Sequence, residues 1–447
     1  MTSAANQHAW VIAVDMGYGH QRTAYPLRDL SPDGAVLLAN NYAGMPDDDR
    51  NIWDRTRRFY ELMSNTQRLP VVGNALFNAF DAVQRILRFY PRRDLSGPDW
   101  NLKAVYSLIE SGWGRDLIER LRTASPTLPL VTSFFVPAFM AEFFDYPGDI
   151  YCIVCDADIA RVWAPPHPAS SKIRYFAPNE RVVERLHLYG VRPENVFLTG
   201  YPLPAENIGD GECRILKEDL GRRLANLDPA GKYSERYGTL IREKVGVVPA
   251  HSGHPLTILF TIGGAGAQKE IASQLLRSLR DRIRKGTIRV VAAVGIKERP
   301  RDYLLHEVAD LGLTEHLGGG VDIVFDRTIA DYFRQFNLAL RTTDVLWTKP
   351  SELSFYTALG VPIVMAPPLG SQEHANREWL LRLGSGMLQE DPRYTDEWFF
   401  DLLHDGWFAE AAMQGFVEGE TLGGLKITRI VQGAGAGSQP ARLVQDG

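Results

Sequence analysis

An apolar run leads directly into a glycine-rich turn in LTILFTIGGAGAQKE, residues 256–270. The same order occurs in the first half of the chain, in WVIAVDMGYGHQRTA, residues 10–24. An apolar, β-branched run followed by a glycine turn and a helical pattern is typical of a parallel α/β unit. Glycine permits close backbone approach, and unpaired amides at a helix start attract anionic phosphate. Each half of the chain therefore predicts a Rossmann-like domain with a turn suited to phosphate.

The two turns supply the first candidate site residues. In the amino-terminal turn, Gly17 and Gly19 form a candidate acceptor or phosphate loop. His20 is a candidate catalytic residue, because an imidazole titrates near neutral pH and can transfer a proton or contact phosphate. The alternative is a loop histidine that caps the helix. The second turn precedes a helix predicted from about Ala267 to Arg284. It offers these donor-binding candidates: Gly263, Gly264, Gly266, Ala267 and Gln268.

Short apolar runs alternate with helical patterns along both halves of the chain. Residues 203–254 lack a strong apolar run, which indicates an inter-domain connection. The expected fold class is α/β, with two Rossmann-like domains facing a central cleft. The expected strands lie at 10–15, 35–40, 129–135, 150–155, 173–176 and 196–199, then at 256–262, 289–294, 321–325, 344–348 and 362–366. The expected parts are an acceptor-side domain (1–204), a connecting region (205–254), a donor-side domain (255–432) and a disordered tail (433–447).

Composition limits the classes of function. A chain of 447 residues is too long for one core, and its net charge of -5 at pH 7 argues against a dedicated nucleic-acid binder. The amino-terminal MTSAANQHAW lacks the basic start and apolar run of a secretory signal, and no apolar stretch approaches the roughly 20 residues that span a bilayer. A cytoplasmic location is expected. Cys152 and Cys155 lie in the apolar run YCIVC, so buried free thiols are expected rather than a zinc site.

A third polar cluster occurs in LWTKPSELSFYTALGVPIVMAPPLGSQEHANREWL, residues 346–380. The pattern predicts a strand, a helix opened by Pro350 and Ser351 and closed by Gly360, a second strand and a further helix start. Polar groups thus gather at successive strand carboxyl ends, where they could hold diphosphate, ribose and sugar hydroxyls. The alternative is a set of solvated or helix-start polar residues. The donor-binding candidates are Lys349, Ser351, Glu352, Gln372, Glu373 and Asn376.

Together, these motifs resemble glycosyltransferase family 28, which includes monogalactosyldiacylglycerol synthase and the peptidoglycan N-acetylglucosaminyltransferase. The resemblance rests on the GYGH turn, the GGAGAQ turn and the TKPSE...LGVP...GSQE..N region. A further block at 155–204, beginning CDADIARVWAPP, is similar to the galactolipid synthase in order and spacing. The resemblance covers most of residues 10–30 and 150–385. It implies the GT-B architecture and inverting transfer of a sugar from a nucleotide sugar, expected to be UDP-linked, to a hydroxyl acceptor.

Asp156 is the candidate general base for that acceptor hydroxyl. It follows the predicted strand at 150–155, at the end that would face a cleft. The alternative is an Asx turn or a helix cap. Asp156 and Asp158 also spell DxD, which binds a metal in a different glycosyltransferase fold. Because the motif lies in the domain away from the expected donor phosphates, no metal and no cofactor are expected besides the nucleotide-sugar substrate.

The chain departs from the family pattern at two places. Phe355 stands where the family carries a ribose-binding Glu, and Glu352 is the candidate replacement. The family's His-Pro-Thr-Trp step is missing near residues 161–163. These departures keep open a catalytically inactive GT-B subunit that binds nucleotide or a partner. A non-hydrolysing sugar-nucleotide epimerase on the same architecture also stays open.

A basic segment with interleaved aromatic residues matches no family motif. Residues 50–93 contain nine Arg, no Lys and three acidic residues, which gives a local net charge of +6. The run VVGNALFNAFDAVQRILRFY (71–90) predicts a helix with one apolar face. Such a segment could lie on anionic lipid at the inner face of the membrane and bring a lipid acceptor to the enzyme. The alternative is an ordinary helix packed in its own domain. The candidate membrane residues are Arg85, Arg88, Arg92 and Arg93.

Overall fold

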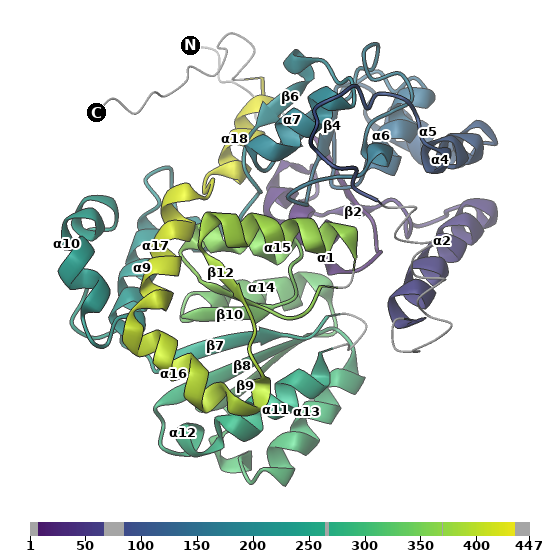
Figure 1. Cartoon of the computed structure of the whole chain (residues 1–447). Helices are drawn as coiled ribbons and strands as arrows, with labels where there is room; N and C mark the ends of the chain where they lie inside the picture. The colour runs from purple at the N-terminus through teal and green to yellow at the C-terminus, as the bar shows by residue number, and fades with distance from the viewer. Residues whose placement is uncertain (1–7, 67–84, 264–267, 369, 434–447) are drawn as a thin grey trace. The chain divides into compact units, whose positions relative to one another are not determined.

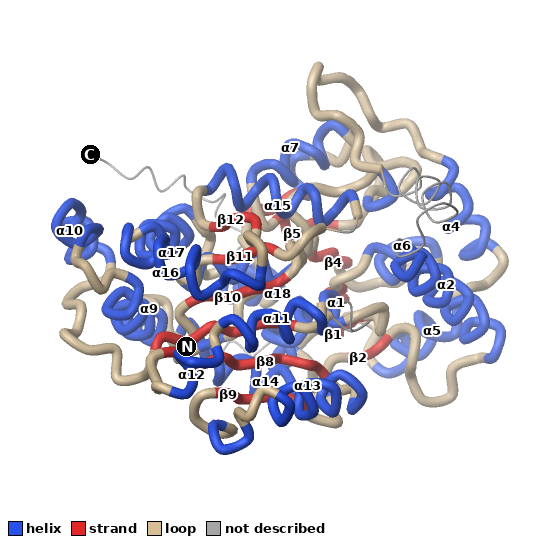
Figure 2. Tube along the Cα trace, turned by 60° about the horizontal axis from the view of Figure 1, so that its bottom comes forward, coloured by secondary structure: helices blue, strands red, loops and turns tan. Residues whose placement is uncertain are grey.

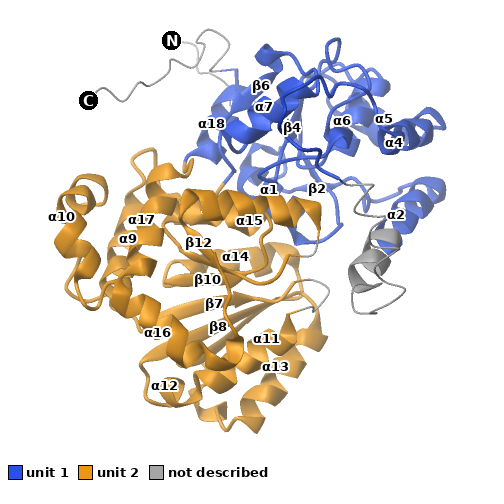
Figure 3. Cartoon of the chain, in the orientation of Figure 1, with its two compact units in different colours: residues 1–202, 422–447 blue, residues 203–421 orange. Residues whose placement is uncertain are grey.

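The computed structural model describes residues 8–66, 85–263, 268–368 and 370–433. The chain forms two compact units, coloured separately in Figure 3. Unit 1 comprises residues 1–202 and 422–447, and unit 2 comprises residues 203–421. Each unit contains one six-stranded sheet in which all of the strand pairs are parallel. The predicted α/β fold with two Rossmann-like domains is confirmed.

The sheet of unit 1 has the strand order β2-β1-β3-β4-β5-β6. The chain moves from β1 to β2 in one direction, and then returns past β1 to build the rest of the sheet in the other direction. The loops after β1 and β3 therefore diverge at a topological switch point, where open α/β sheets bind ligands. The strands are β1 (Trp10–Ala13), β2 (Leu37–Leu38), β3 (Leu130–Thr132), β4 (Ile150–Ile153), β5 (Arg174–Ala177) and β6 (Val196–Leu198).

Helices of unit 1 connect these strands (Figure 1). One of them, α18 (Gly423–Val431), comes from the carboxyl-terminal end of the chain and belongs to unit 1. Its Ile427 and Val431 join the core cluster that contains Leu27 and Leu30. The others are α1 (Tyr18–Ala24), η1 (Tyr25–Leu30), α2 (Asp47–Thr66), α4 (Trp100–Glu110), α5 (Arg115–Ala124), α6 (Phe135–Phe143), η2 (Arg161–Trp163), α7 (Glu180–Leu188) and η3 (Pro193–Asn195).

The sheet of unit 2 has the strand order β12-β11-β10-β7-β8-β9. Counted from β7, this is the Rossmann order 3-2-1-4-5-6, which reverses between β7 and β10. Because parallel crossovers are right-handed, the helices after β7 and β8 cover one face, and those after β10 and β11 cover the other. The strands are β7 (Leu256–Thr261), β8 (Ile288–Gly295), β9 (Val321–Phe325), β10 (Val345–Thr348), β11 (Ile363–Met365) and β12 (Gly386–Leu388).

Figure 2 shows the strands of unit 2 running between helices. The helix predicted from about Ala267 to Arg284 is two helices in the structure, because Leu279 leaves the helical conformation between them. The helices of unit 2 are α8 (Ala205–Ile208), α9 (Arg214–Leu227), α10 (Lys232–Lys244), α11 (Lys269–Ser278), α12 (Arg280–Arg284), α13 (Glu298–Asp310), η4 (Thr314–His316), α14 (Ile329–Leu340), η5 (Glu352–Leu359), α15 (Ser371–Leu383), η6 (Pro392–Tyr394), α16 (Thr395–Asp405) and α17 (Trp407–Glu418).

Residues 205–254, expected as a connecting region, differ from that expectation. They form α8, α9 and α10 and belong to unit 2. In α9, Leu216, Leu220, Leu224 and Leu227 are buried, at a spacing that places them on one helical face. In the sequence, charged residues stand between these leucines. The segment therefore lacks the continuous apolar run that marks a buried strand.

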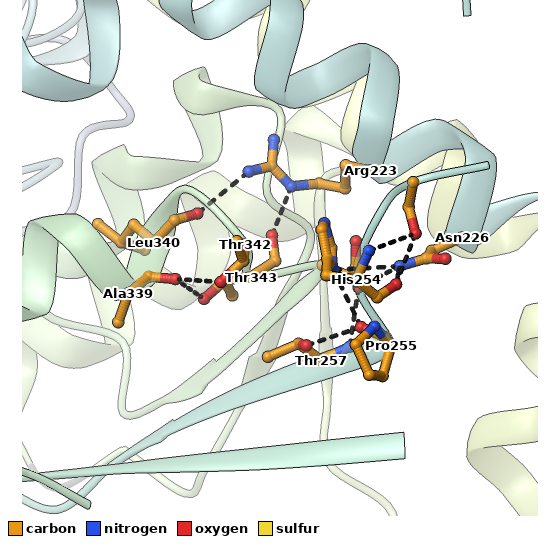
Figure 4. Close-up of polar contacts among 11 residues, drawn as sticks. Arg223, Asn226, His254, Pro255, Thr257, Ala339, Leu340, Thr342 and Thr343 are labelled. Atoms are coloured by element: carbon orange, nitrogen blue, oxygen red, sulfur yellow. Dashed lines mark hydrogen bonds and ion pairs between the residues drawn. The ribbon is translucent and has the colours of Figure 1, made fainter. Parts of the chain in front are cut away.

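Arg223 ties α9 to the loop that precedes β10 (Figure 4) and to the end of η5. Its Nε donates to the Thr343 carbonyl at 2.7 Å, and one guanidinium nitrogen donates to the Leu359 and Gly360 carbonyls at 2.8 and 3.1 Å. The side chain is 3% exposed, and burial lowers the pKa of the guanidinium. A buried charge held by backbone carbonyls is costly to remove from its partners. The helix is therefore an integral part of unit 2 rather than a linker.

The boundaries of the two units also differ in part from the predicted domain boundaries. The domain boundary expected at 204 lies between residues 202 and 203, and residues 422–432 belong to unit 1. The expected disordered tail falls outside the described residues, apart from Gly433. Strand β12 was not expected, because its three residues include glycine and the exposed Leu388 and make no apolar run.

Candidate functional site

The turn after β1 is shaped by glycine. Gly17 has φ 105° and ψ 178° and precedes helix α1. This φ lies in the region that side chains disfavour, so the turn requires glycine at this position. His20 sits within the first turn of α1 and is half-buried. The turn therefore brings an imidazole to the β1/β3 switch point of unit 1.

The hydrogen bonds of His20 define which ring nitrogen carries the proton. Its Nδ1 lies 2.9 Å from the carbonyl oxygen of Ser133, the residue that follows β3. A carbonyl oxygen can only accept, so Nδ1 donates and is protonated. In the neutral imidazole, Nε2 then carries the lone pair. The ring also packs against Phe134, at 4.7 Å between centroids. Any proton that the neutral ring accepts would therefore be bound at Nε2.

Asp156 and Cys155 follow β4, beside this histidine. The Cys155 sulfur lies 3.6 Å from His20 Nδ1 and 4.0 Å from Asp156 Oδ2. Asp156 is half-buried, whereas Cys155 is 4% exposed. The structure therefore brings the two predicted catalytic residues, His20 and Asp156, into one cluster with Cys155 between them.

Asp158, the second acidic residue of the DxD motif, has a different environment. It is 4% exposed, and its oxygens accept from Arg185 at 2.7 and 2.8 Å and from Arg181 at 2.9 Å. A buried carboxylate paired with two guanidinium groups stabilises the packing of α7. Asp156 and Asp158 thus point to different partners. Among the described residues, no group of three or more His, Cys, Asp or Glu side chains is placed to hold a metal ion.

In unit 2, the turn after β7 is described only at its ends. The Gly263 amide donates to Gln268 Oε1 at 3.2 Å, and Gln268 is 5% exposed. Gly264, Gly266 and Ala267 lie outside the described residues. Helix α11 begins at Lys269, immediately after this turn. The start of a ten-residue helix provides amides and a positive dipole end next to the turn.

The segments after β10 and β11 meet through an ion pair. Lys349 Nζ lies 2.5 Å from Glu373 Oε1, and their side chains are 34% and 14% exposed. Asn376 is completely buried, and its amide donates to the Pro350 carbonyl at 3.4 Å. Both contacts join the turn after β10 to the first turns of α15. The predicted cluster at the strand ends is therefore present as a geometric arrangement.

The other candidates of this region take different positions. Ser351 and Glu352 lie at the start of η5 and are half-buried, and Gln372 lies in the first turn of α15. Phe355, in the place of the family's ribose-binding Glu, is 3% exposed and packs against Trp379 with 4.9 Å between ring centroids. That position is therefore part of the core, and Glu352 is the nearest acidic residue in sequence that stays partly accessible.

Several residues of these clusters were not predicted from the sequence. Ser133 contributes a backbone carbonyl, which has no sequence signal. Cys155 was expected only as a buried thiol; it is a buried thiol outside any disulfide, and it also contacts His20. Asp15, at the end of β1, accepts from Gln21 at 3.2 Å and lies 3.8 Å from Arg57. Its place between β1 and the GYGH turn was a usable signal.

The basic segment differs from its predicted helix. Residues 67–84 lie outside the description, and residues 85–90 form neither helix nor strand. Phe89 is buried beneath Arg181, whose guanidinium lies 3.9 Å from the ring centroid. Arg92 pairs with Glu184 at 2.9 Å. Arg85, Arg88, Arg92 and Arg93 are exposed. No helix in the described part of the chain is both long and apolar enough to cross a membrane.

Two parallel sheets with polar clusters at their switch points define a twin-Rossmann protein. The family described as "Domain of unknown function (DUF6938)" matches residues 247–318, less than half of the chain. No curated protein matches the sequence.

Solved structures similar to this chain include a putative UDP-N-acetylglucosamine 2-epimerase from Listeria monocytogenes, at 14% identity and a TM-score of 0.46, covering 82% of this chain and 86% of that one. Acinetobacter baumannii MurG has 14% identity and a TM-score of 0.44, covering 96% and 99%. UDP-GlcNAc 2-epimerase from Neisseria meningitidis, bound to UDP-GlcNAc, has 12% identity and a TM-score of 0.42, covering 80% and 89%. These similarities are too low to carry a conclusion about activity.

Proposed function

We propose that the protein is an inverting glycosyltransferase that uses a nucleotide sugar, with UDP as the expected nucleotide. One observation carries the proposal: each Rossmann-like sheet has a polar cluster beside its switch point, and the two clusters differ in chemistry. Unit 2 presents amides, an ammonium group and amide or carboxylate side chains, which suit a diphosphate and a sugar. Unit 1 presents a carboxylate and an imidazole, which suit proton removal from an acceptor.

Donor binding is assigned to the β7/β10 switch point of unit 2. Amides at the start of α11 and the Lys349 ammonium group would stabilise the diphosphate, including the charge that develops as it leaves. Lys349 is already held by Glu373 at 2.5 Å, so a bound diphosphate would compete with this carboxylate. Gln372 and Glu373 would bind sugar hydroxyls. Because Asn376 is buried and bonded to the Pro350 carbonyl, its proposed role is to hold the turn in place.

Sugar transfer then requires one deprotonation and one displacement. Asp156 takes the proton of the acceptor hydroxyl, and the resulting oxygen nucleophile attacks the anomeric carbon. The bond from that carbon to the diphosphate oxygen breaks, and the nucleoside diphosphate leaves with the electron pair. A single displacement inverts the configuration at the anomeric carbon. His20, a base through Nε2, is the second group for proton transfer, to the acceptor or to a phosphate.

A lipid acceptor is part of the proposal. Its support is the set of exposed arginines at residues 85–93, together with Tyr90, which is 65% exposed. Anionic headgroups attract exposed basic side chains, and exposed aromatic rings favour the interfacial region. Peripheral association with an anionic surface would bring unit 1 to a headgroup hydroxyl.

The proposed function is tested by ligand stabilisation and product analysis. A panel of nucleotides and nucleotide sugars is scored by the shift in melting temperature, since ligand at 100 times its Kd adds about 2.7 kcal/mol to stability. The binding nucleotide sugars are then incubated with and without lipid extracts. Transfer of the sugar supports the proposal. Epimerised nucleotide sugar formed without acceptor supports the epimerase instead, and tight binding with no product identifies an inactive subunit.

A further inference from the structure

The Cys155 thiol lies between the two candidate catalytic groups of unit 1, and the proposed reaction does not use it. Its sulfur is 3.6 Å from His20 Nδ1 and 4.0 Å from Asp156 Oδ2. With 4% exposure, the side chain is largely shielded from bulk solvent. A thiol is a weak donor and a weak acceptor, so it can bond to both neighbours at once.

The direction of these bonds follows from the Ser133 carbonyl. Because this oxygen accepts from His20 Nδ1 at 2.9 Å, the nitrogen carries a proton. The Cys155 sulfur can then only accept from the same N–H, and its own S–H remains to donate toward the Asp156 carboxylate. The hydrogen bonds therefore run in one direction: His20 Nδ1 donates to the Cys155 sulfur, and the Cys155 thiol donates to the Asp156 carboxylate.

We infer that Cys155 is a positioning residue that orients the His20 ring and donates to the Asp156 carboxylate. The catalytic roles of those two residues rest on the proposed function, whereas the positioning itself is a property of unit 1 without substrate. The ring is restrained by the Ser133 carbonyl, by the Cys155 sulfur and by the Phe134 ring at 4.7 Å. These contacts keep Nδ1 protonated and leave proton transfer to Nε2.

The kinetic test compares Cys155→Ala, Cys155→Ser and the control Cys152→Ala. Cys152 is also a buried thiol, but it lies within β4, near Tyr175. Because Cys155→Ala loses the sulfur hydrogen bonds, we expect kcat to fall about two- to fivefold. The KM for the nucleotide sugar should not change. The acidic limb of the kcat/KM profile moves to higher pH, because the carboxylate loses a donor. The serine variant restores part of both effects, and Cys152→Ala shows neither.

A second readout needs no substrate. Long-range proton–nitrogen NMR on histidine-labelled protein reports the tautomer of His20, with the signal assigned by its loss in His20→Gln. The wild type shows Nδ1 protonated, and Cys155→Ala shifts the Nδ1 resonance, whereas Cys152→Ala does not. If the spectra show these results but no nucleotide sugar is turned over, the positioning role stands and the proposed function fails. An Nε2-protonated wild type, or unchanged kinetics and spectra in both Cys155 variants, overturns the inference.

Discussion

Asp344 should make the stability of unit 2 depend on pH in an unusual direction. This residue precedes β10 and is completely buried. Its Oδ2 accepts from the Thr257 amide at 2.8 Å and from Asn226 Nδ2 at 2.9 Å, and the His254 ring lies 3.7 Å away. Burial, only partly offset by these donors and by the charge of Arg223, raises the pKa of Asp344 from 3.8 to about 7.

The sign of the effect follows from proton binding. Between about pH 4 and pH 7, the folded protein keeps the proton on Asp344, while the unfolded chain has lost it. Stability from this group is therefore present at low pH and is lost as the pH rises through 7. The slope is about 1.4 kcal/mol per pH unit, so two units, from pH 5 to pH 7, give an upper value of about 3 kcal/mol.

The assay is denaturant unfolding at pH 5, 6, 7 and 8, followed by tryptophan fluorescence, for the wild type and Asp344→Asn. Asparagine cannot titrate, so the difference in unfolding free energy between the two proteins should change by about 3 kcal/mol across this range. Asp405→Asn is the control, because its ion pair with Lys232 lowers the pKa of this carboxyl and moves its titration below the range. Parallel pH curves for the wild type and Asp344→Asn would show that Asp344 does not keep its proton in the folded protein.

Three further results are expected. Asp156→Asn should lower sugar transfer by roughly 10²–10⁴ while nucleotide binding persists, as measured by kinetics and calorimetry; unchanged turnover would contradict a general base. Lys349→Met should weaken UDP binding by about tenfold or more. Glu373→Gln should leave UDP binding at least as tight and weaken only the binding of the nucleotide sugar. If the two variants changed the Kd for UDP equally, the assigned roles would be wrong. The protein should co-sediment with anionic but not neutral vesicles, less so at high salt or when the four exposed arginines at residues 85–93 become Gln.

The strands were accessible to sequence reasoning because most of them are short apolar runs before turns. Strands β7 and β10 are buried along their whole length, and threonine is the only polar residue type in either strand, so their apolar runs are easy to recognise. The donor-side cluster was also foreseeable, since Lys349 and Glu373 follow successive strands of a parallel sheet. What could not be foreseen was their direct ion pair, which depends on the packing of α15 against the turn.

Other features depend on contacts between residues far apart in sequence. α9 carries charged residues within its apolar pattern, and Arg223 is buried only because carbonyls from η5 and from the end of α14 surround it. α18 joins unit 1 across more than 200 intervening residues. The tautomer of His20 depends on a backbone carbonyl 113 residues away. Local patterns contain no information about such partners.

We propose that unit 2 binds the nucleotide sugar at the β7/β10 switch point and that unit 1 supplies the acceptor-side groups. The decisive measurement is a crystal structure of the whole protein with the bound nucleotide sugar. We expect the diphosphate against the turn that begins at Gly263 and near Lys349, with the sugar near Gln372 and Glu373. A diphosphate bound instead at Gly17–His20 would contradict it, because donor and acceptor would then have exchanged units.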